Sequence, residues 1–92
     1  MSDVLDPLKE RLQRTVDCLD RLAARVRSGK ARVADFRQAR AALAWLPLSA
    51  AEFALAVSRL ENARHYLLAG EQGAAGYELR LLIGSLQLGK SY

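Results

Sequence analysis

VRSGKARVADF, at residues 26–36, and LLAGEQGAAGY, at residues 67–77, follow one pattern, and this pattern decides the fold of the 92-residue chain. In each stretch a glycine stands at the fourth position, an alanine at the ninth and an aromatic residue at the eleventh. Glycine is common just after the end of a helix because it adopts positive φ without steric cost. Each stretch is therefore typical of the turn between two antiparallel helices.

The segments before the two turns repeat as well, at the same spacing of 41 residues. The matching apolar pairs are Leu12 with Phe53, Val16 with Val57, Leu19 with Leu60, and Val26 with Leu67. Ala, Leu, Arg and Glu dominate the chain and β-branched residues are scarce, which favours helix. The repeat indicates two tandem αα-hairpins, although any two amphipathic hairpins would look alike at this level.

We predict an all-α protein of four helices arranged as two tandem αα-hairpins, at residues 7–46 and 49–88. A chain of this length makes one domain, which we place at residues 1–92. The four helices could form a small helical bundle or a short helical-repeat unit.

The first hairpin has clear start and stop signals. Asp6 and Pro7 are typical of a helix start, where an acid caps the N-terminus and proline takes the first helical position. We expect this helix to end at Gly29 and a second helix, at about residues 31–46, to be ended by Pro47. The apolar seam of the first helix consists of Leu8, Leu12, Thr15, Leu19, Leu22 and Val26, widened by Val16 and Ala23.

The second hairpin opens with a capping box, in which Ser49 and Glu52 satisfy each other's backbone N–H groups. Gly70 is expected to end this third helix. The fourth helix is expected to begin near residues 73–75 and to end at Gly89.

The composition bounds the class of protein. The chain is 51% hydrophobic and 26% charged, which is typical of a globular protein. No apolar run approaches the roughly 20 residues that cross a bilayer, and the start MSDVLDPLKER lacks the apolar region of a signal peptide. We therefore expect a soluble, cytoplasmic protein with no membrane partner.

The residues that could carry chemistry are few. Cys18 is the single cysteine, which excludes an internal disulfide, and with His65 it offers too few ligands for a typical structural zinc site. We predict an exposed His65 and a half-buried, inert Cys18. Since no catalytic constellation is recognisable, the sequence predicts no enzyme, no cofactor and no metal site.

A phosphate-loop pattern, G-x-x-x-x-G-K-[ST], is matched by GSLQLGKS at residues 84–91. Such a loop needs a strand before it and a helix after it, so that the helix N-terminus holds the phosphate. Here a predicted helix precedes the pattern and only Tyr92 follows it. We interpret it as a helix C-cap glycine followed by a basic tail.

Arg64 is unusual because it points along the apolar stripe of the third predicted helix. It could extend to solvent on its aliphatic stem, pair with an acid such as Asp20 or Glu78, or reach an acid on a partner. The internal pair is favoured.

The fourth predicted helix is apolar on two opposite faces. One face carries Ala75, Leu79, Leu82 and Leu86, and the other carries Tyr77, Leu81, Gly84 and Leu88. A four-helix protein cannot easily enclose one of its own helices, so the second face is expected to meet another chain. Trp45 either folds over the corner at residues 46–48 or acts as an aromatic anchor for a partner. The candidate partner-binding residues are thus Trp45, Tyr77, Leu81 and Leu88.

Basic residues are concentrated in the first hairpin. Residues 1–46 hold ten Lys and Arg against six Asp and Glu, whereas residues 47–92 hold four of each. The predicted patch consists of Arg21, Arg25, Arg27, Lys30, Arg32, Arg37 and Arg40. It could be a solvated face, or it could meet an acidic protein or a phosphate backbone.

The first hairpin resembles the small needle chaperones of bacterial type III secretion. The matching positions are Leu8 and Leu12, the turn Arg27-Ser28-Gly29, Phe36, and the Ala/Leu-rich run at residues 39–43. In the second hairpin, Tyr66, Gly70, Ala75 and Leu79 are similar in placement to a tetratricopeptide repeat, and such repeats partner those chaperones. The resemblance implies a small helical protein that covers an aggregation-prone partner helix.

Together these features predict a non-enzymatic helical interaction protein: an adaptor, a secretion-type chaperone or an inhibitor. It would bind another protein, for which an acidic surface is one option, or a second copy of itself as a homodimer, through an apolar helix face. The basic residues would steer the partner. The alternative is a small basic protein associated with nucleic acid, although the hairpin lacks a recognition helix.

Overall fold

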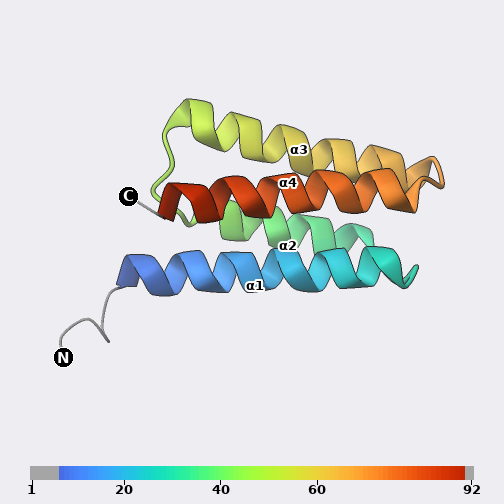
Figure 1. Ribbon diagram of the computed structural model, residues 1–92, viewed down its shortest axis with the longest axis horizontal. Helices are drawn as coiled ribbons and strands as arrows, with labels where there is room; N and C mark the ends of the chain where they lie inside the picture. Colours follow the sequence, from blue (N-terminus) through green and yellow to red (C-terminus); the bar gives the residue numbers. More distant parts are fainter. Residues whose placement is uncertain (1–6, 91–92) are drawn as a thin grey trace.

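The computed structural model describes residues 7–90, with side chains described through residue 88. It contains four helices: α1 (Pro7–Arg27), α2 (Val33–Ala44), α3 (Ala50–Leu68) and α4 (Gln72–Lys90). Consecutive helices run in opposite directions along the long axis (Figure 1). The predicted all-α class with four helices is therefore confirmed.

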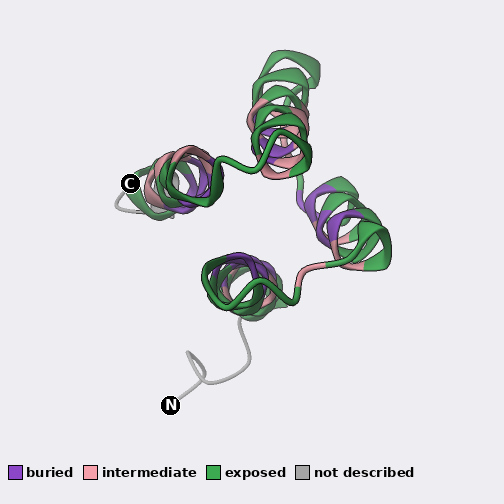
Figure 2. Cartoon of the chain, turned by 90° about the vertical axis from the view of Figure 1, so that its right-hand side faces the viewer, coloured by how far each residue is buried: buried purple, intermediate pink, exposed green. Residues whose placement is uncertain are grey.

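The four helices close into a ring. Each helix packs against the next one in sequence, and α4 also packs against α1, with the most extensive contact between α3 and α4 and the smallest between α2 and α3. Figure 2, a view along the long axis, shows the helices around a common centre with their buried faces turned inward. The arrangement is that of a small up-down-up-down helical bundle.

All four helices contribute apolar side chains to one core. The buried apolar residues are Val16, Leu19, Leu22, Ala23, Val26, Phe36, Ala39, Leu43, Leu46, Ala56, Leu60, Ala63, Ala75, Leu79, Leu82, Ile83 and Leu86. The predicted seam of α1 is buried from Thr15 onward, whereas Leu12 is half-buried and Leu8 is exposed. The Thr15 hydroxyl donates to the Arg11 carbonyl at 2.9 Å, so this buried polar group is satisfied within its own helix.

The two glycine turns have the same backbone geometry. Gly29 and Gly70 have φ values of 74° and 81°, in the left-handed region. After α1, the N–H of Lys30 donates to the Arg25 carbonyl at 2.8 Å. After α3, the N–H of Glu71 donates to the Tyr66 carbonyl, also at 2.8 Å. These are Schellman caps, which satisfy carbonyls at the helix ends, and they lie 41 residues apart, as the repeat predicts.

Two predicted helix boundaries differ from the structure. Helix α2 was expected at about residues 31–46 but spans Val33–Ala44, because Arg32 is extended at the N-cap and Pro47 disfavours helical geometry at the residue before it. Helix α4 begins at Gln72 and continues through Gly89 to Lys90, so Gly89 is not the predicted stop. The predicted N-cap Asp6 lies outside the described residues.

The predicted capping box at α3 is present. The N–H of Glu52 donates to Ser49 Oγ at 3.1 Å, and the N–H of Ser49 donates to Glu52 Oε1 at 2.8 Å.

Within residues 7–90, none of the helices has an apolar stretch long enough to cross a membrane.

Candidate interaction surface

The outward face of α4 is apolar. The opposite side of this helix is buried against the core through Ala75, Leu79, Leu82 and Leu86. On the outward face, Tyr77 is 54% exposed and Leu88 is 71% exposed, while Leu81 and Gly84 are half-buried. Three of the four predicted partner-binding residues therefore lie together on one helix face. We refer to Tyr77, Leu81, Gly84 and Leu88 as the α4 face.

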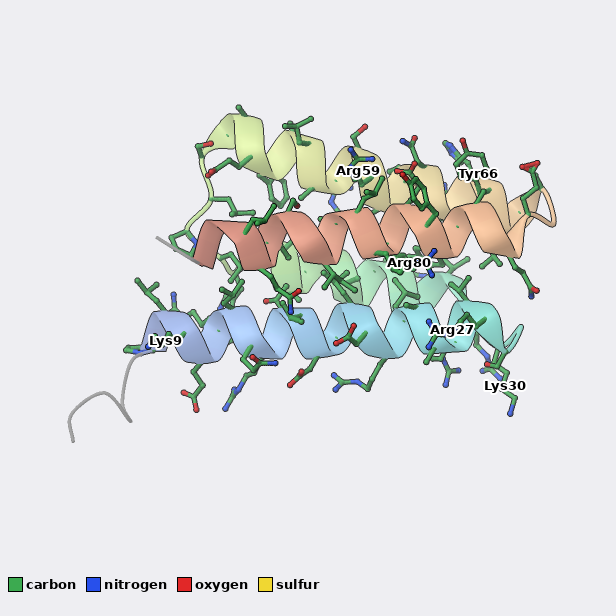
Figure 3. The ribbon with its side chains drawn as sticks, in the orientation of Figure 1. Lys9, Arg27, Lys30, Arg59, Tyr66 and Arg80 are labelled. Atoms are coloured by element: carbon green, nitrogen blue, oxygen red, sulfur yellow. The ribbon has the colours of Figure 1, made fainter. Side chains whose placement is uncertain are left out.

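The charged residues nearest to the α4 face lie on its two flanks. Glu78 turns toward α3, where its Oε1 accepts a hydrogen bond from Arg59 Nη1 at 3.1 Å, and its side chain is only 13% exposed. Arg80 extends from the side of α4 that faces α1 (Figure 3). The apolar strip between these flanks therefore offers packing contact without a charge that a partner would have to desolvate.

Trp45, the fourth predicted residue, belongs to a different surface. It follows the last residue of α2 and is 57% exposed. The guanidinium carbon of Arg11, on α1, lies 5.2 Å from the centroid of its ring, within the range of a cation–π contact. The contact of Trp45 is therefore with α1, at the end of the bundle where α1 begins and α2 and α4 end (Figure 1).

The predicted basic patch is divided among several faces. Arg21 and Arg25 line a cavity of about 210 Å³ between α1 and α2, together with Cys18, Asp35 and Gln38. Each of the basic residues Arg27, Arg37 and Arg40 stands two positions after one of these cavity residues. At 100° per residue, that places it about 160° around its helix from the cavity. The seven residues therefore do not form one continuous surface.

Asp35 neutralises part of this basic region. Its Oδ2 accepts hydrogen bonds from the backbone N–H of Arg32 at 2.8 Å and from Arg25 Nε at 3.0 Å. The Arg32 bond, and then the bond and charge of Arg25, hold the pKa of the Asp35 carboxyl below its ordinary value, although partial burial opposes them. Arg25 also donates to the Lys30 carbonyl at 3.1 Å, which ties the loop after α1 to the start of α2.

The structure changes the prediction for Arg64. Its Nε lies 3.3 Å from Glu61 Oε1, one turn earlier in α3, and not beside Asp20 or Glu78. Glu78 is paired instead with Arg59, which sequence reasoning did not single out. The spacing of Arg64 and Glu61, three residues apart on a helix, is a local signal that could have predicted this pair.

The predicted exposure of His65, on α3, and the predicted partial burial of Cys18 are confirmed. Burial raises the pKa of the Cys18 thiol above its usual value, and the nearby Arg21 opposes this shift. A raised thiol pKa lowers the fraction of reactive thiolate, as expected for an inert cysteine.

An apolar pocket, which sequence reasoning missed, lies at the end of the bundle where α1 begins and α4 ends. Its volume is about 520 Å³. It is lined mainly by aliphatic side chains from α1, the corner between α2 and α3, and the facing sides of α3 and α4, including Leu12, Leu48, Leu55, Ala56 and Leu86. No sequence pattern predicts this pocket. It forms because side chains from several helices leave space between the helix ends, and this depends on how the helices pack.

The phosphate-loop pattern does not form a loop. Its positions from Gly84 to Lys90 lie within the continuous helix α4, and Ser91 lies outside the described residues. A helix interior has its N–H groups bonded to its own carbonyls, so this segment has none to offer to a phosphate.

Comparison of the chain with protein-family models, with curated proteins and with solved structures found no significant match. In the part of the chain that the structure describes, no group of three or more His, Cys, Asp or Glu side chains is placed to hold a metal ion.

Proposed function

We propose that this protein is a non-enzymatic, cytoplasmic interaction module, of the adaptor, secretion-type chaperone or inhibitor class, that binds an apolar helix on its α4 face. The observation that carries this proposal is that Tyr77 and Leu88 are more than half exposed on a helix whose other side is fully buried. The bundle already encloses one face of α4, so the second face is available to a partner.

The chemistry of the α4 face defines the kind of partner. Its residues repeat at the i, i+4, i+7 and i+11 spacing of one helix face, from Tyr77 to Leu88. A partner helix with apolar residues at the same spacing would pack along it, which is the helix-on-helix mode of recognition. Arg27, Lys30 and Arg80, which lie toward the same end of the bundle (Figure 3), would steer a partner with acidic flanking residues.

A selection experiment tests this proposal. A displayed library of amphipathic helical peptides is panned on the immobilised full chain, and each enriched peptide is then measured against two variants. Leu88→Asp places a charge on the α4 face, and Leu68→Asp makes the same change at a leucine of α3 that is equally exposed, at 70% against 71%.

We expect the enriched peptides to lose at least about tenfold in affinity for Leu88→Asp, because a buried carboxylate without a partner is costly, and to bind Leu68→Asp as they bind the unmodified chain. Binding should change little between 50 mM and 500 mM salt. A library that yields no binder, or binders that do not distinguish the two variants, would contradict the proposal.

Association with nucleic acid is the second candidate, supported by the excess of Lys and Arg in the first hairpin. The division of these residues among several faces, and the pairing of Arg25 with Asp35, make it the weaker candidate. Binding to a phosphate backbone should fall steeply with salt and should be lost when Arg25, Arg27 and Arg32 are replaced together by alanine. If a partner binds in a salt-resistant way and still binds after this triple change, that partner is not held through a phosphate backbone.

A further inference from the structure

We propose that the α4 face pairs with the α4 face of a second copy of this chain, in an antiparallel arrangement with twofold symmetry. This inference rests on the proposed function, because it names the partner that the same face would bind. In a symmetric dimer of this kind each patch must be complementary to itself.

The order of residues on the α4 face meets this requirement. A twofold axis midway between Leu82 and Ile83 pairs positions whose numbers add to 165. It brings Tyr77 opposite Leu88 of the partner subunit, and Leu81 opposite Gly84 of the partner subunit. Two large side chains then meet near each end of the contact, and near its centre a leucine meets a residue without a side chain.

Because Gly84 has no side chain, it leaves a notch in the α4 face, and this notch can receive the opposing Leu81. A Cβ atom at Gly84 would meet nothing within 4 Å, so the bundle itself does not require glycine at this position. Glycine in the interior of a helix is also unfavourable relative to alanine. Gly73 and Gly76 of α4 have the same open surroundings, but of the three only Gly84 belongs to the α4 face. A helix that approaches from outside can use the missing side chain to admit the opposing Leu81, as small residues do at closely packed helix pairs.

The flanks of the α4 face are compatible with the same symmetry. On the flank that faces α1, Arg80 comes within about 3 Å, along the helix axis, of Gln87 of the partner subunit, which can accept a hydrogen bond from it. On the other flank, Glu78 is already paired with Arg59 inside its own chain. The two copies of Arg80 share the flank that faces α1 but are offset by about 7 Å along the axis, so among the described side chains of α4 no like charges are directly opposite each other, an arrangement that would oppose self-association.

The contact is small, and this sets the expected affinity. The α4 face runs from residue 77 to residue 88, about 17 Å of helix. One pair of helices of this length buries less than the roughly 800 Å² per partner of a standard interface. We therefore expect a reversible dimer with a Kd on the order of 100 µM.

Sedimentation equilibrium of the full chain between about 10 µM and 1 mM tests the inference. We expect the average mass to rise from monomer toward dimer across this range. Gly84→Leu, which fills the notch, and Leu88→Asp should each weaken the dimer at least about tenfold with an unchanged helical circular dichroism spectrum. Leu68→Asp should leave the mass curve as it is. A chain that stays monomeric at 1 mM, or a dimer that is insensitive to both changes on the α4 face, would overturn the inference.

Cross-linking tests the direction of the helices without altering the α4 face. In a Cys18→Ser background, Arg80→Cys and Gln87→Cys chains are treated with a short bismaleimide, singly and mixed. Along the axis of an antiparallel pair, residue 80 of one chain lies about 3 Å from residue 87 of the other. Residue 80 lies about 7 Å from residue 80 of the other chain, and residue 87 about 13 Å from residue 87 of the other chain. The mixture should therefore cross-link faster than either single variant, and the reverse order would contradict the antiparallel arrangement.

The two sets of results separate this inference from the proposed function. If the chain stays monomeric but selected peptides bind it, and Leu88→Asp abolishes their binding, the α4 face binds a foreign helix and only the inference fails. If the dimer forms and Gly84→Leu disrupts it, the inference holds even when no peptide is enriched.

Discussion

Gly29 and Gly70 each hold the chain in a conformation that other residues reach only with strain. Both lie at the position after a helix where φ is positive, and both are followed by a backbone hydrogen bond that spans five residues. The sequence signal was strong here because the requirement is local: positive φ is nearly free for glycine and costly for any residue with a Cβ atom.

Replacing Gly70 by alanine should destabilise the fold by about 1–2 kcal/mol, because the Cβ atom clashes with its own backbone at positive φ. Nothing else lies within 4 Å of that Cβ, so the effect is purely conformational. Gly29→Ala should cost at least as much, because its Cβ would also come within 3.3 Å of the Gln72 side chain. Urea denaturation measures both.

Gly73→Ala is the control, since Gly73 lies inside α4 with open space around it. Alanine there should be neutral or stabilising by up to about 1 kcal/mol. Equal effects of Gly70→Ala and Gly73→Ala would show that the left-handed geometry is not what fixes glycine at the turn.

At the scale of helices, Asp35 joins α1 to the start of α2. Its carboxylate caps the N–H of Arg32 and pairs with Arg25 of α1. Sequence reasoning treated Asp35 only as the single acid of the basic region. The capping role depends on where α2 begins, and that boundary shifted by two residues from the predicted one.

The lowered pKa of Asp35 predicts how this junction responds to acid. The unfolded chain protonates Asp35 near pH 4, whereas the folded chain does so at a lower pH. The junction therefore stabilises the fold fully above about pH 4, and this stabilisation is lost as the pH falls through the folded pKa. Asp35→Asn should lower the urea midpoint at pH 7, and the difference from the unmodified chain should shrink below pH 4.

Asp20→Asn is a suitable control for this titration, because Asp20 is exposed on α1 and has no ion pair among the described residues. Its urea midpoint should stay close to that of the unmodified chain at both pH values. A difference for Asp35→Asn that is the same at pH 3 and pH 7 would mean that its ionisation does not contribute to stability.

At the scale of the whole molecule, the bundle has a buried apolar core and, at one end, a pocket of about 520 Å³. Ala56 and Ala63 are both buried and lie two helical turns apart on α3. Ala56 lines the pocket, whereas Ala63 is fully enclosed and does not.

This difference predicts opposite responses to the same substitution. Ala63→Leu should destabilise the bundle by about 1–3 kcal/mol through overpacking. Ala56→Leu should change stability by less than about 1 kcal/mol, or raise it, because the added atoms enter the pocket and bury apolar surface there. The unfolding free energies of the two variants measure the contrast, and equal losses would mean that the pocket offers no usable space.

The sequence by itself determined the helices, their order and the glycine turns, because hydrophobic periodicity, capping boxes and positive φ are properties of short segments. It also indicated that α4 has a second apolar face, since 100° per residue separates Tyr77 and Leu88 from Leu79 and Leu82. Only the tertiary structure decided what depends on neighbouring helices. In the structure Arg59 pairs with Glu78, the basic residues are divided among several faces, Trp45 contacts Arg11 of α1, and a pocket lies at one end. These features depend on the packing angles and relative lengths of the helices, which no local pattern specifies.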